Sequence, residues 1–243
     1  MDSSTRPTAE IVSHCWQYSR LLTYQLSGFV LHPPANCNLT VTVFHAAEDD
    51  DTRRTLDFFA ALSPPRVTWN FLAIERPRLM RRAIGRNLAC KATAADWVLM
   101  TDCDYVFGAG AIDLIVDGLR FAGQSVLGHV REHSASTSQA DGDAEIERVT
   151  GPDVVGVDPS RYSPSRLARA IGGSQFVPGD WARVRGYLPN SRRFQRPAGE
   201  WQRTFEDTSF RRTCGLPQFA IDCPAMYRIR HSQRGRFQRG VKL

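Results

Sequence analysis

The sequence predicts an α/β fold in which helices flank a mostly parallel central sheet, with a smaller second subregion. Strand-like and helix-like segments alternate four times over residues 11–130. This alternation favours a parallel sheet because parallel neighbours need a helical crossover between them. Polar and acidic clusters follow the candidate strands at residues 16–18, 48–51 and 102–104. In such sheets ligands bind where the strands end, so these clusters predict a shared site.

The elements of the first half follow from local composition. Residues 11–15 form a short apolar run, and β-branched or apolar stretches predict strands at 39–44, 66–74, 96–101 and 125–130. Helical patterns lie between them at 20–31, 52–62, 78–93 and 108–121. Proline pairs at 33–34 and 64–65 end the first two helices, because proline lacks the backbone donor that a helix needs.

The second half is less regular. Residues 133–165 are polar, rich in Ser, Gly and Asp, and lack periodicity, so we expect a long flexible loop or lid, with disorder as the alternative. Residues 168–186 predict a turn, a strand and a helix, 205–212 a helix, and 218–230 paired extended segments. We therefore expect one domain divided into residues 1–132, the loop 133–165, and residues 166–243.

Composition narrows the possible partners and the compartment. The formal net charge of +6 and pI of about 9.2 favour anionic partners: nucleic acid, a membrane surface or a phosphorylated small molecule. The six cysteines show no CxxC pair or zinc-like spacing, which indicates reduced thiols and a cytoplasmic location. The first ten residues lack a secretory pattern, and no apolar run approaches the roughly 20 residues of a membrane span.

The most informative stretch is WVLMTDCDYVF, residues 97–107. Residues i and i+2 of a strand face the same way, so we expect Asp102 and Asp104 to project together and Cys103 to point into packing. Two such carboxylates repel each other unless a cation lies between them, and Mg²⁺ or Mn²⁺ suits oxygen ligands. Two solvated carboxylates at a strand end are the alternative. Because the two aspartates follow an apolar strand in a half of the chain where strands and helices alternate, a metal site is the favoured interpretation.

RRAIGRNLACKA followed by DWVLMTDCDYVF resembles the nucleotide-binding half of GT-A-fold glycosyltransferases of the family-2 type. Arg86 and Asn87 match the helix element, and Asp102 and Asp104 match the D-x-D motif; the likeness covers residues 9–130 well and the remainder loosely. It implies that Asp104 binds a metal on the donor diphosphate, with Asp102 near the ribose or sugar. Arg86 can brace an aspartate or a phosphate bidentately, unless it is a solvated cation.

The same resemblance extends to the second half. Glu206 and Asp207 are similar to the acidic pair of inverting members, which implies that Asp207 is the general base and Glu206 its neighbour; a helix N-terminus that uses the dipole is the alternative. His231 stands where such enzymes place a late metal ligand. The arginines near it would neutralise a diphosphate or belong to a basic tail: Arg228, Arg230, Arg234, Arg236 and Arg239.

The resemblance also implies where the nucleotide base binds. Trp16 and Tyr18 fall at the position that contacts the base, although the usual Pro-x-Tyr-Asn is absent. The acidic residue that commonly reads uracil after the second strand is displaced, since Phe44 and His45 occupy its place and the acids come later, at Glu48 and Asp49. A UDP-sugar is the expected donor, with the identity of the base left open.

Together these features predict a Mn²⁺- or Mg²⁺-dependent, inverting glycosyltransferase that moves a sugar from a nucleotide sugar to a hydroxyl acceptor, with the acceptor bound by the region after residue 168. A sugar-phosphate nucleotidyltransferase is the alternative enzyme. Such enzymes usually have a glycine-rich loop after the first strand, and residues 13–19 contain no glycine, which disfavours this class. A basic nucleic-acid-binding module would leave the acidic pairs unexplained, so we expect no nucleic-acid partner.

Overall fold

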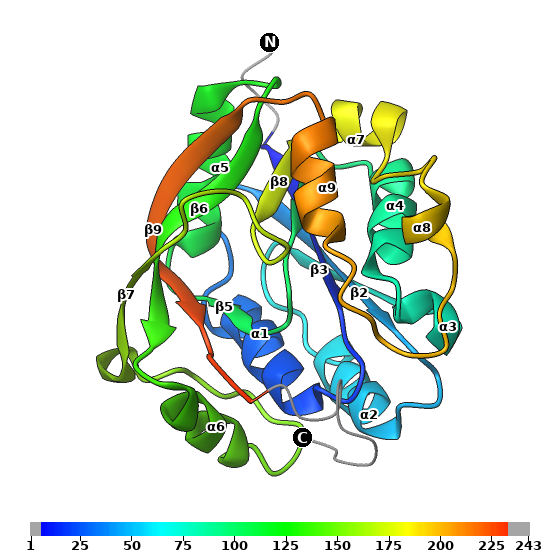
Figure 1. Ribbon diagram of the computed structural model, residues 1–243. Coiled ribbons are helices and arrows are strands. Elements are labelled where there is room, and N and C mark those ends of the chain that lie inside the picture. Colours follow the sequence, from blue (N-terminus) through cyan, green and yellow to red (C-terminus); the bar gives the residue numbers. More distant parts are fainter. Residues whose placement is uncertain (1–5, 233–243) are drawn as a thin grey trace.

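The computed structural model describes residues 6–232, which form one α/β unit around a nine-stranded sheet (Figure 1). The strands run in the order β3-β2-β1-β4-β8-β6-β9-β5, and β7 pairs with β6. The predicted α/β class is confirmed. The sheet is mixed, however, because only the first four strands form a purely parallel set and the later ones include antiparallel pairs.

The parallel half contains β1 (Thr8–His14), β2 (Asn38–His45), β3 (Val67–Ala73) and β4 (Trp97–Met100). The intervening helices are α1 (Ser19–Leu31), α2 (Asp50–Ala60), α3 (Arg76–Leu79) and α4 (Arg82–Ala92). All four residues of β4 are buried, as a continuous apolar run predicts for a strand covered on both faces. This half therefore matches the alternation that the sequence predicts.

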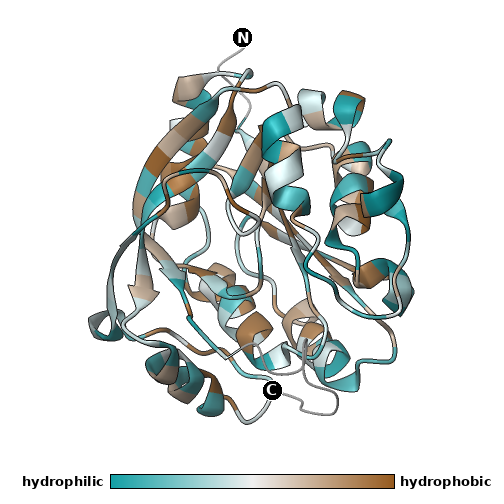
Figure 2. Ribbon diagram, in the orientation of Figure 1, coloured by the Kyte–Doolittle hydropathy of each residue, from teal (hydrophilic) through white to brown (hydrophobic). Residues whose placement is uncertain are grey.

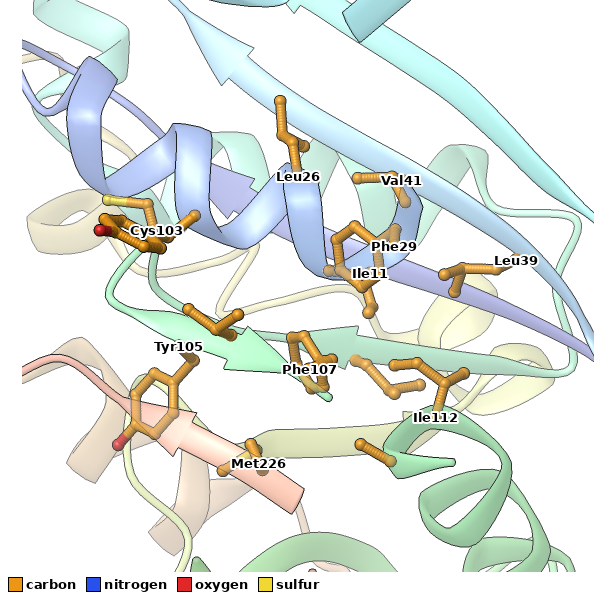
Figure 3. Packing of buried hydrophobic residues seen from close by; sticks show 14 of the residues in the cluster. Ile11, Leu26, Phe29, Leu39, Val41, Cys103, Tyr105, Phe107, Ile112 and Met226 are labelled. Carbon is orange, nitrogen blue, oxygen red and sulfur yellow. The ribbon is translucent and has the colours of Figure 1, made fainter. Parts of the chain in front are cut away.

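Two apolar clusters lie on opposite faces of the parallel strands. Ile11 and Leu99 belong to the cluster that includes α1, whereas their neighbours Val12 and Val98 belong to the cluster with α4 and α7. This division follows from the two-residue period of a strand, which sends successive side chains to opposite faces. Figure 3 shows part of the first cluster, where Phe29 of α1 packs beside the strands and stacks on Phe107 at a centroid distance of 5.4 Å.

The second half completes the sheet with β5 (Tyr105–Phe107), β6 (Leu127–Ser136), β7 (Tyr162–Arg166), β8 (Gln175–Pro178) and β9 (Gln218–Arg228). Its helices are α5 (Ala111–Ala122), α7 (Gly179–Arg185), α8 (Arg192–Gln195) and α9 (Glu206–Thr213). β4 and β5 are separated by a short turn, yet they occupy the fourth and last places in the strand order. The sheet therefore curls and brings β5 against α1.

The expectation of an irregular loop over residues 133–165 was wrong. This stretch contains the end of β6, helix α6 (Gln139–Glu147), a 3₁₀ turn (Pro159–Arg161) and most of β7. A capping box starts α6: Ser138 Oγ accepts from the Asp141 amide, and the Asp141 carboxylate accepts from the Ser138 amide. The helix has no apolar stripe, which explains why hydrophobic periodicity does not reveal it.

Residues 218–230 also differ from expectation. Instead of paired extended segments, they contain the single strand β9, which runs parallel to β6 and antiparallel to β5. A sequence pattern cannot distinguish strands that pair with each other from one strand that pairs with distant partners, because both are simply extended and half buried.

No helix in the described part of the chain is long and apolar enough to cross a membrane; the longest, α1, has 13 residues. All six cysteines are free thiols, and Cys214 alone among them is only partly buried.

Candidate functional site

A cavity of about 450 Å³ opens where β1 and β4 end. Six of the eight residues that the sequence predicts for the site line this cavity: Tyr18, Asp102, Asp104, Glu206, Asp207 and His231. They come from four separate segments of the chain, so folding brings them together. The other two, Trp16 and Arg86, do not line the cavity.

The two D-x-D aspartates lie on the turn that joins β4 to β5, not on a strand. The i, i+2 strand argument therefore does not describe their geometry, although both side chains reach the same cavity. Gln25 of α1 holds the turn, because its Nε2 donates to the carbonyls of Asp102 at 2.9 Å and Tyr105 at 3.1 Å. Cys103 points into the core as predicted and is 3% exposed (Figure 3).

Arg82 joins the two acidic pairs of the site. Its Nη1 donates to Asp102 Oδ1 at 2.5 Å, and its Nη2 lies 3.0 Å from Glu206 Oε1. The guanidinium is well shielded, with 14% of the side chain exposed. One cation thus compensates carboxylates that are more than a hundred residues apart in the sequence. This arrangement links the end of β4 to the start of α9.

Arg86 lies behind Asp102 and is fully buried. Its Nη2 donates to the Gly172 carbonyl at 2.6 Å and lies 3.4 Å from Asp102 Oδ1, and its Nη1 donates to the Tyr187 hydroxyl at 3.1 Å. Of the two roles that the sequence offers this residue, its contacts fit the bracing of an aspartate. Trp16 lies outside the cavity, where the Arg76 guanidinium sits 5.2 Å from its ring.

Asp104 has one oxygen in use and one without a partner. Its Oδ2 accepts from Arg228 Nε at 3.3 Å, whereas Oδ1 is buried and has no hydrogen bond within the described structure. A buried carboxylate oxygen without a donor is costly, and it is a suitable ligand for a hard cation. Among residues 6–232 no three His, Cys, Asp or Glu side chains gather into a complete metal site.

His231 reaches the cavity on the short segment that follows β9. The next residue, Ser232, is bound to Asp143 of α6 through its backbone amide at 2.7 Å, and the Arg230 amide donates to Ser136 Oγ at 2.8 Å. The His231 ring meets Tyr18 edge to face at a centroid distance of 5.3 Å. The stretch predicted as a loop therefore anchors a predicted metal ligand. Arg234, Arg236 and Arg239 lie outside the described residues.

Glu206 and Asp207 begin α9, which is mostly hydrophilic (Figure 2). Glu206 is buried, and burial alone would raise its pKa; the charges of Arg82 and Arg86 and a hydrogen bond from Thr204 outweigh burial, so the pKa is lowered. Asp207 is half buried, and its Oδ2 accepts from the Gly172 amide at 3.0 Å. No arginine or lysine pairs with Asp207 in the part of the chain that the structure describes.

Asp49, the displaced acid after β2, has a structural task. Its Oδ2 accepts from the Gln17 amide at 2.6 Å and from the Thr52 hydroxyl at 2.8 Å, and its Oδ1 accepts from the Thr52 amide in the first turn of α2. Gln17 itself has a positive φ of 57°. The carboxylate thus holds the turn after β1 in place and is not part of the cavity lining.

Sequence reasoning misses several residues of the cavity wall, among them Arg82, Arg169, Arg203 and Phe205. Arg82 could have been found, because it precedes Arg86 by one helical turn and so shares a helix face with a residue already singled out. Arg169, Arg203 and Phe205 lie on irregular segments between elements, where no periodic pattern marks them.

No protein-family model matches the sequence, and a comparison with curated proteins finds no match. The structure, by contrast, resembles solved glycosyltransferases. The mannosyltransferase PcManGT from Pyrobaculum calidifontis, in complex with GDP-Man and Mn²⁺, matches with a TM-score of 0.55 at 18% identity, over 96% of this chain and 59% of that one. TarS 1–349 from S. aureus matches with a TM-score of 0.59 at 11% identity, over 91% of this chain and 60% of that one.

A further TarS structure, in complex with UDP-GlcNAc, matches with a TM-score of 0.57 at 11% identity, over 90% of this chain and 58% of that one. The chain thus spans about three fifths of the length of these solved structures. Likeness over nine tenths of the chain at such low identity is a statement about architecture. The protein has the fold of the GT-A glycosyltransferases.

Proposed function

We propose that the protein is a glycosyltransferase that moves a sugar from a nucleotide-sugar donor, a UDP-sugar, to a hydroxyl acceptor. The observation that carries the proposal is the convergence of two acidic pairs, a histidine and a tyrosine on one cavity of about 450 Å³. A volume of this order suits a small-molecule ligand. Fold neighbours in complex with GDP-Man and Mn²⁺ and with UDP-GlcNAc support the assignment.

The donor occupies the side of the cavity formed by Tyr18, Asp102, Asp104 and His231. Tyr18 is buried at the start of α1 and contacts the nucleotide. Asp102 lies beside Arg82 and accepts hydrogen bonds from the ribose or sugar hydroxyls. Its side chain is 27% exposed, so an oxygen is within reach of a ligand in the cavity.

A divalent metal, Mn²⁺ or Mg²⁺, fits the atoms that the site provides. Asp104 Oδ1 is the unpartnered buried oxygen, and His231 offers an imidazole nitrogen in the same cavity. These two residues would hold the ion, with diphosphate oxygens completing its coordination. When bound, the ion supplies a Lewis acid that stabilises the departing nucleoside diphosphate. Arg228 lies beside Asp104 and adds positive charge on the same side of the cavity.

Asp207 is the general base. A base must accept a proton from the acceptor hydroxyl, and the lowered pKa and arginine contacts of Glu206 make that neighbour unsuitable. The Gly172 amide orients Asp207 through Oδ2, which leaves Oδ1 to accept the proton. Gln175 Nε2 donates to the Asp207 carbonyl at 2.8 Å and fixes the backbone. Attack from the face opposite the leaving group inverts the anomeric centre.

Thermal-shift measurement against a panel of UDP-, GDP-, ADP- and dTDP-sugars, with and without Mn²⁺, tests this function. We expect a UDP-sugar to raise the melting temperature of the wild type when Mn²⁺ is present. Asp104→Asn should lose this Mn²⁺-dependent response, and Asp50→Asn, at an exposed ion pair on α2, should keep it. If no nucleotide sugar raises the melting temperature under either condition, the proposed function is wrong.

A further inference from the structure

The charges that line the cavity are unequally paired. The lining contains four arginines and four carboxylates. Arg82 binds two of the carboxylates and Arg228 a third. Within residues 6–232 no carboxylate lies within 4.0 Å of the guanidinium groups of the other two arginines, Arg169 and Arg203, and both are exposed. These two cations therefore have no counter-ion from the described protein.

Both unpaired arginines belong to the segments that hold Asp207. Arg169 stands in the connection between β7 and β8, directly before the residues whose backbone contacts α9: the Ala170 carbonyl accepts from Arg211, and the Gly172 amide donates to Asp207. Arg203 lies three residues before Glu206, in the segment that leads into α9. The two arginines are thus on the side of the cavity where the proposed base works.

Arg169 also faces a second cation. Arg211 lies close enough to it that, after burial, repulsion by Arg169 is the main influence that lowers the Arg211 pKa. Asp207 opposes this repulsion by raising the Arg211 pKa, and an anionic ligand at Arg169 would relieve it further. This side of the cavity therefore favours a bound anion.

Phe205 is the apolar feature of the same region. It is 52% exposed at the cavity wall, and its backbone is left-handed, with φ of 57°. Such a conformation is strained for a non-glycine residue, and such strain occurs often at functional sites. The turn sends Glu206 inward to Arg82 and leaves the Phe205 ring outward, with the Arg203 guanidinium 4.9 Å from the ring centroid.

We propose that Arg169, Arg203 and Phe205, here called the acceptor rim, bind an acceptor that carries a carboxylate or phosphate on a ring. The ring stacks on Phe205, the two guanidiniums bind the anion, and a ring hydroxyl meets Asp207. This inference rests on the proposed function, because it assigns the acceptor of the same reaction. Arginine suits the task, since its planar fork matches carboxylate and phosphate oxygens.

Binding of matched aryl sugars, measured by ligand-observed NMR, tests the acceptor rim without a donor. The probes are 4-nitrophenyl glucoside, the corresponding glucuronide and the corresponding 6-phosphate, which share a ring and differ in charge. We expect the wild type to bind one or both anionic probes about tenfold more tightly than the glucoside, the size of an exposed charge-assisted hydrogen bond. Which anionic probe binds better identifies the carboxylate or the phosphate as the recognised group.

The variants separate charge from stacking. Arg169→Gln/Arg203→Gln should remove the preference for anionic probes, whereas Arg185→Gln, an exposed arginine at the end of α7, should keep it. Phe205→Ala should weaken the binding of all three probes to a similar degree. Equal affinity for charged and neutral probes in the wild type, or no binding of any probe, overturns the proposal.

A parallel donor measurement distinguishes the two proposals. The double variant should keep the wild-type thermal shift with the nucleotide sugar and Mn²⁺. Loss of that shift would assign the arginines to the donor diphosphate and overturn the acceptor rim, while the glycosyltransferase proposal would stand. Absence of any donor shift in the wild type contradicts the proposed function itself, whatever the aryl sugars do.

Discussion

Replacement of Arg82 by methionine removes the cation that joins Asp102 to Glu206. Glu206 is affected most, because its side chain is only 6% exposed and its Oε1 accepts a hydrogen bond from Arg82 Nε at 3.1 Å and lies 3.0 Å from Arg82 Nη2. Breaking a buried ion pair by deleting one partner typically costs about 3–5 kcal/mol. Asp102 is more exposed and still has Arg86 at 3.4 Å, so the loss of its ion pair with Arg82 costs less free energy. We expect Arg82→Met to lower the free energy of unfolding by about 3 kcal/mol or more at neutral pH.

The effect of Arg82→Met on the free energy of unfolding should depend on pH through Glu206. In the wild type the pKa of Glu206 is lower when folded than when unfolded, so its contribution to stability is present above the unfolded pKa of about 4.3 and is lost as pH falls below it. Without Arg82, burial is opposed only by Arg86 and by hydrogen bonds from Thr204 and the backbone, so the folded pKa of Glu206 lies higher than in the wild type. The variant should therefore gain less stability than the wild type as pH rises through the acidic range.

Urea unfolding at several pH values measures both effects. A double variant, Arg82→Met/Glu206→Gln, should recover most of the loss, because it leaves no buried charge unpaired. Arg53→Met is the matched control: its partner Asp50 is exposed, so the change should stay within about 0.5 kcal/mol. A loss below about 1 kcal/mol in Arg82→Met, or a loss that is equal at all pH values, would refute this reasoning.

Three further predictions concern the site. Asp207→Asn should leave the donor thermal shift intact and lower turnover by roughly 10²–10⁴-fold; near-normal turnover would exclude it as the base. His231→Ala should weaken Mn²⁺ binding in calorimetry with donor present, and an unchanged titration would return this residue to a structural role. Gly142→Ala should destabilise the protein by about 1–3 kcal/mol in urea and weaken Mn²⁺ binding as well. The reason is that a Cβ at this position would clash with the Arg230 carbonyl oxygen, next to His231; a variant as stable as the wild type would contradict this close approach.

The sequence predicts the parallel half of the fold well because the relevant signals are local. Strand β4 is a run of four buried apolar residues, and the flanking helices have the periodicity and proline stops that mark their ends. The acidic pairs are equally local features; Asp102 and Asp104 follow a parallel strand and so lie at the edge where ligands bind, whereas packing of α9 brings Glu206 and Asp207 to the same cavity. Six of the eight predicted site residues therefore meet at one cavity.

The features that the sequence did not predict share a physical cause. Helix α6 depends on its capping box and on burial of Glu145 and Ile146, not on an apolar stripe, so periodicity does not find it. Strand β9 pairs with β6 and β5, which precede it by about a hundred residues, and no local pattern specifies such partners. For Arg86 the sequence leaves open whether it braces an acidic group or is a solvated cation, and only the packing of Gly172 and Tyr187 around it, which buries it completely, distinguishes the two.

The sequence by itself determined the succession of strands and helices in the first half and the residue types of the site, because both depend on neighbours along the chain. The tertiary structure alone decided which charges pair. Arg82 forms ion pairs with Asp102 and Glu206, and Arg228 forms one with Asp104. The two arginines of the acceptor rim form no ion pair with a carboxylate of the described residues. Ion pairing depends on distance in space and on exclusion of water, and both arise only when remote segments pack together.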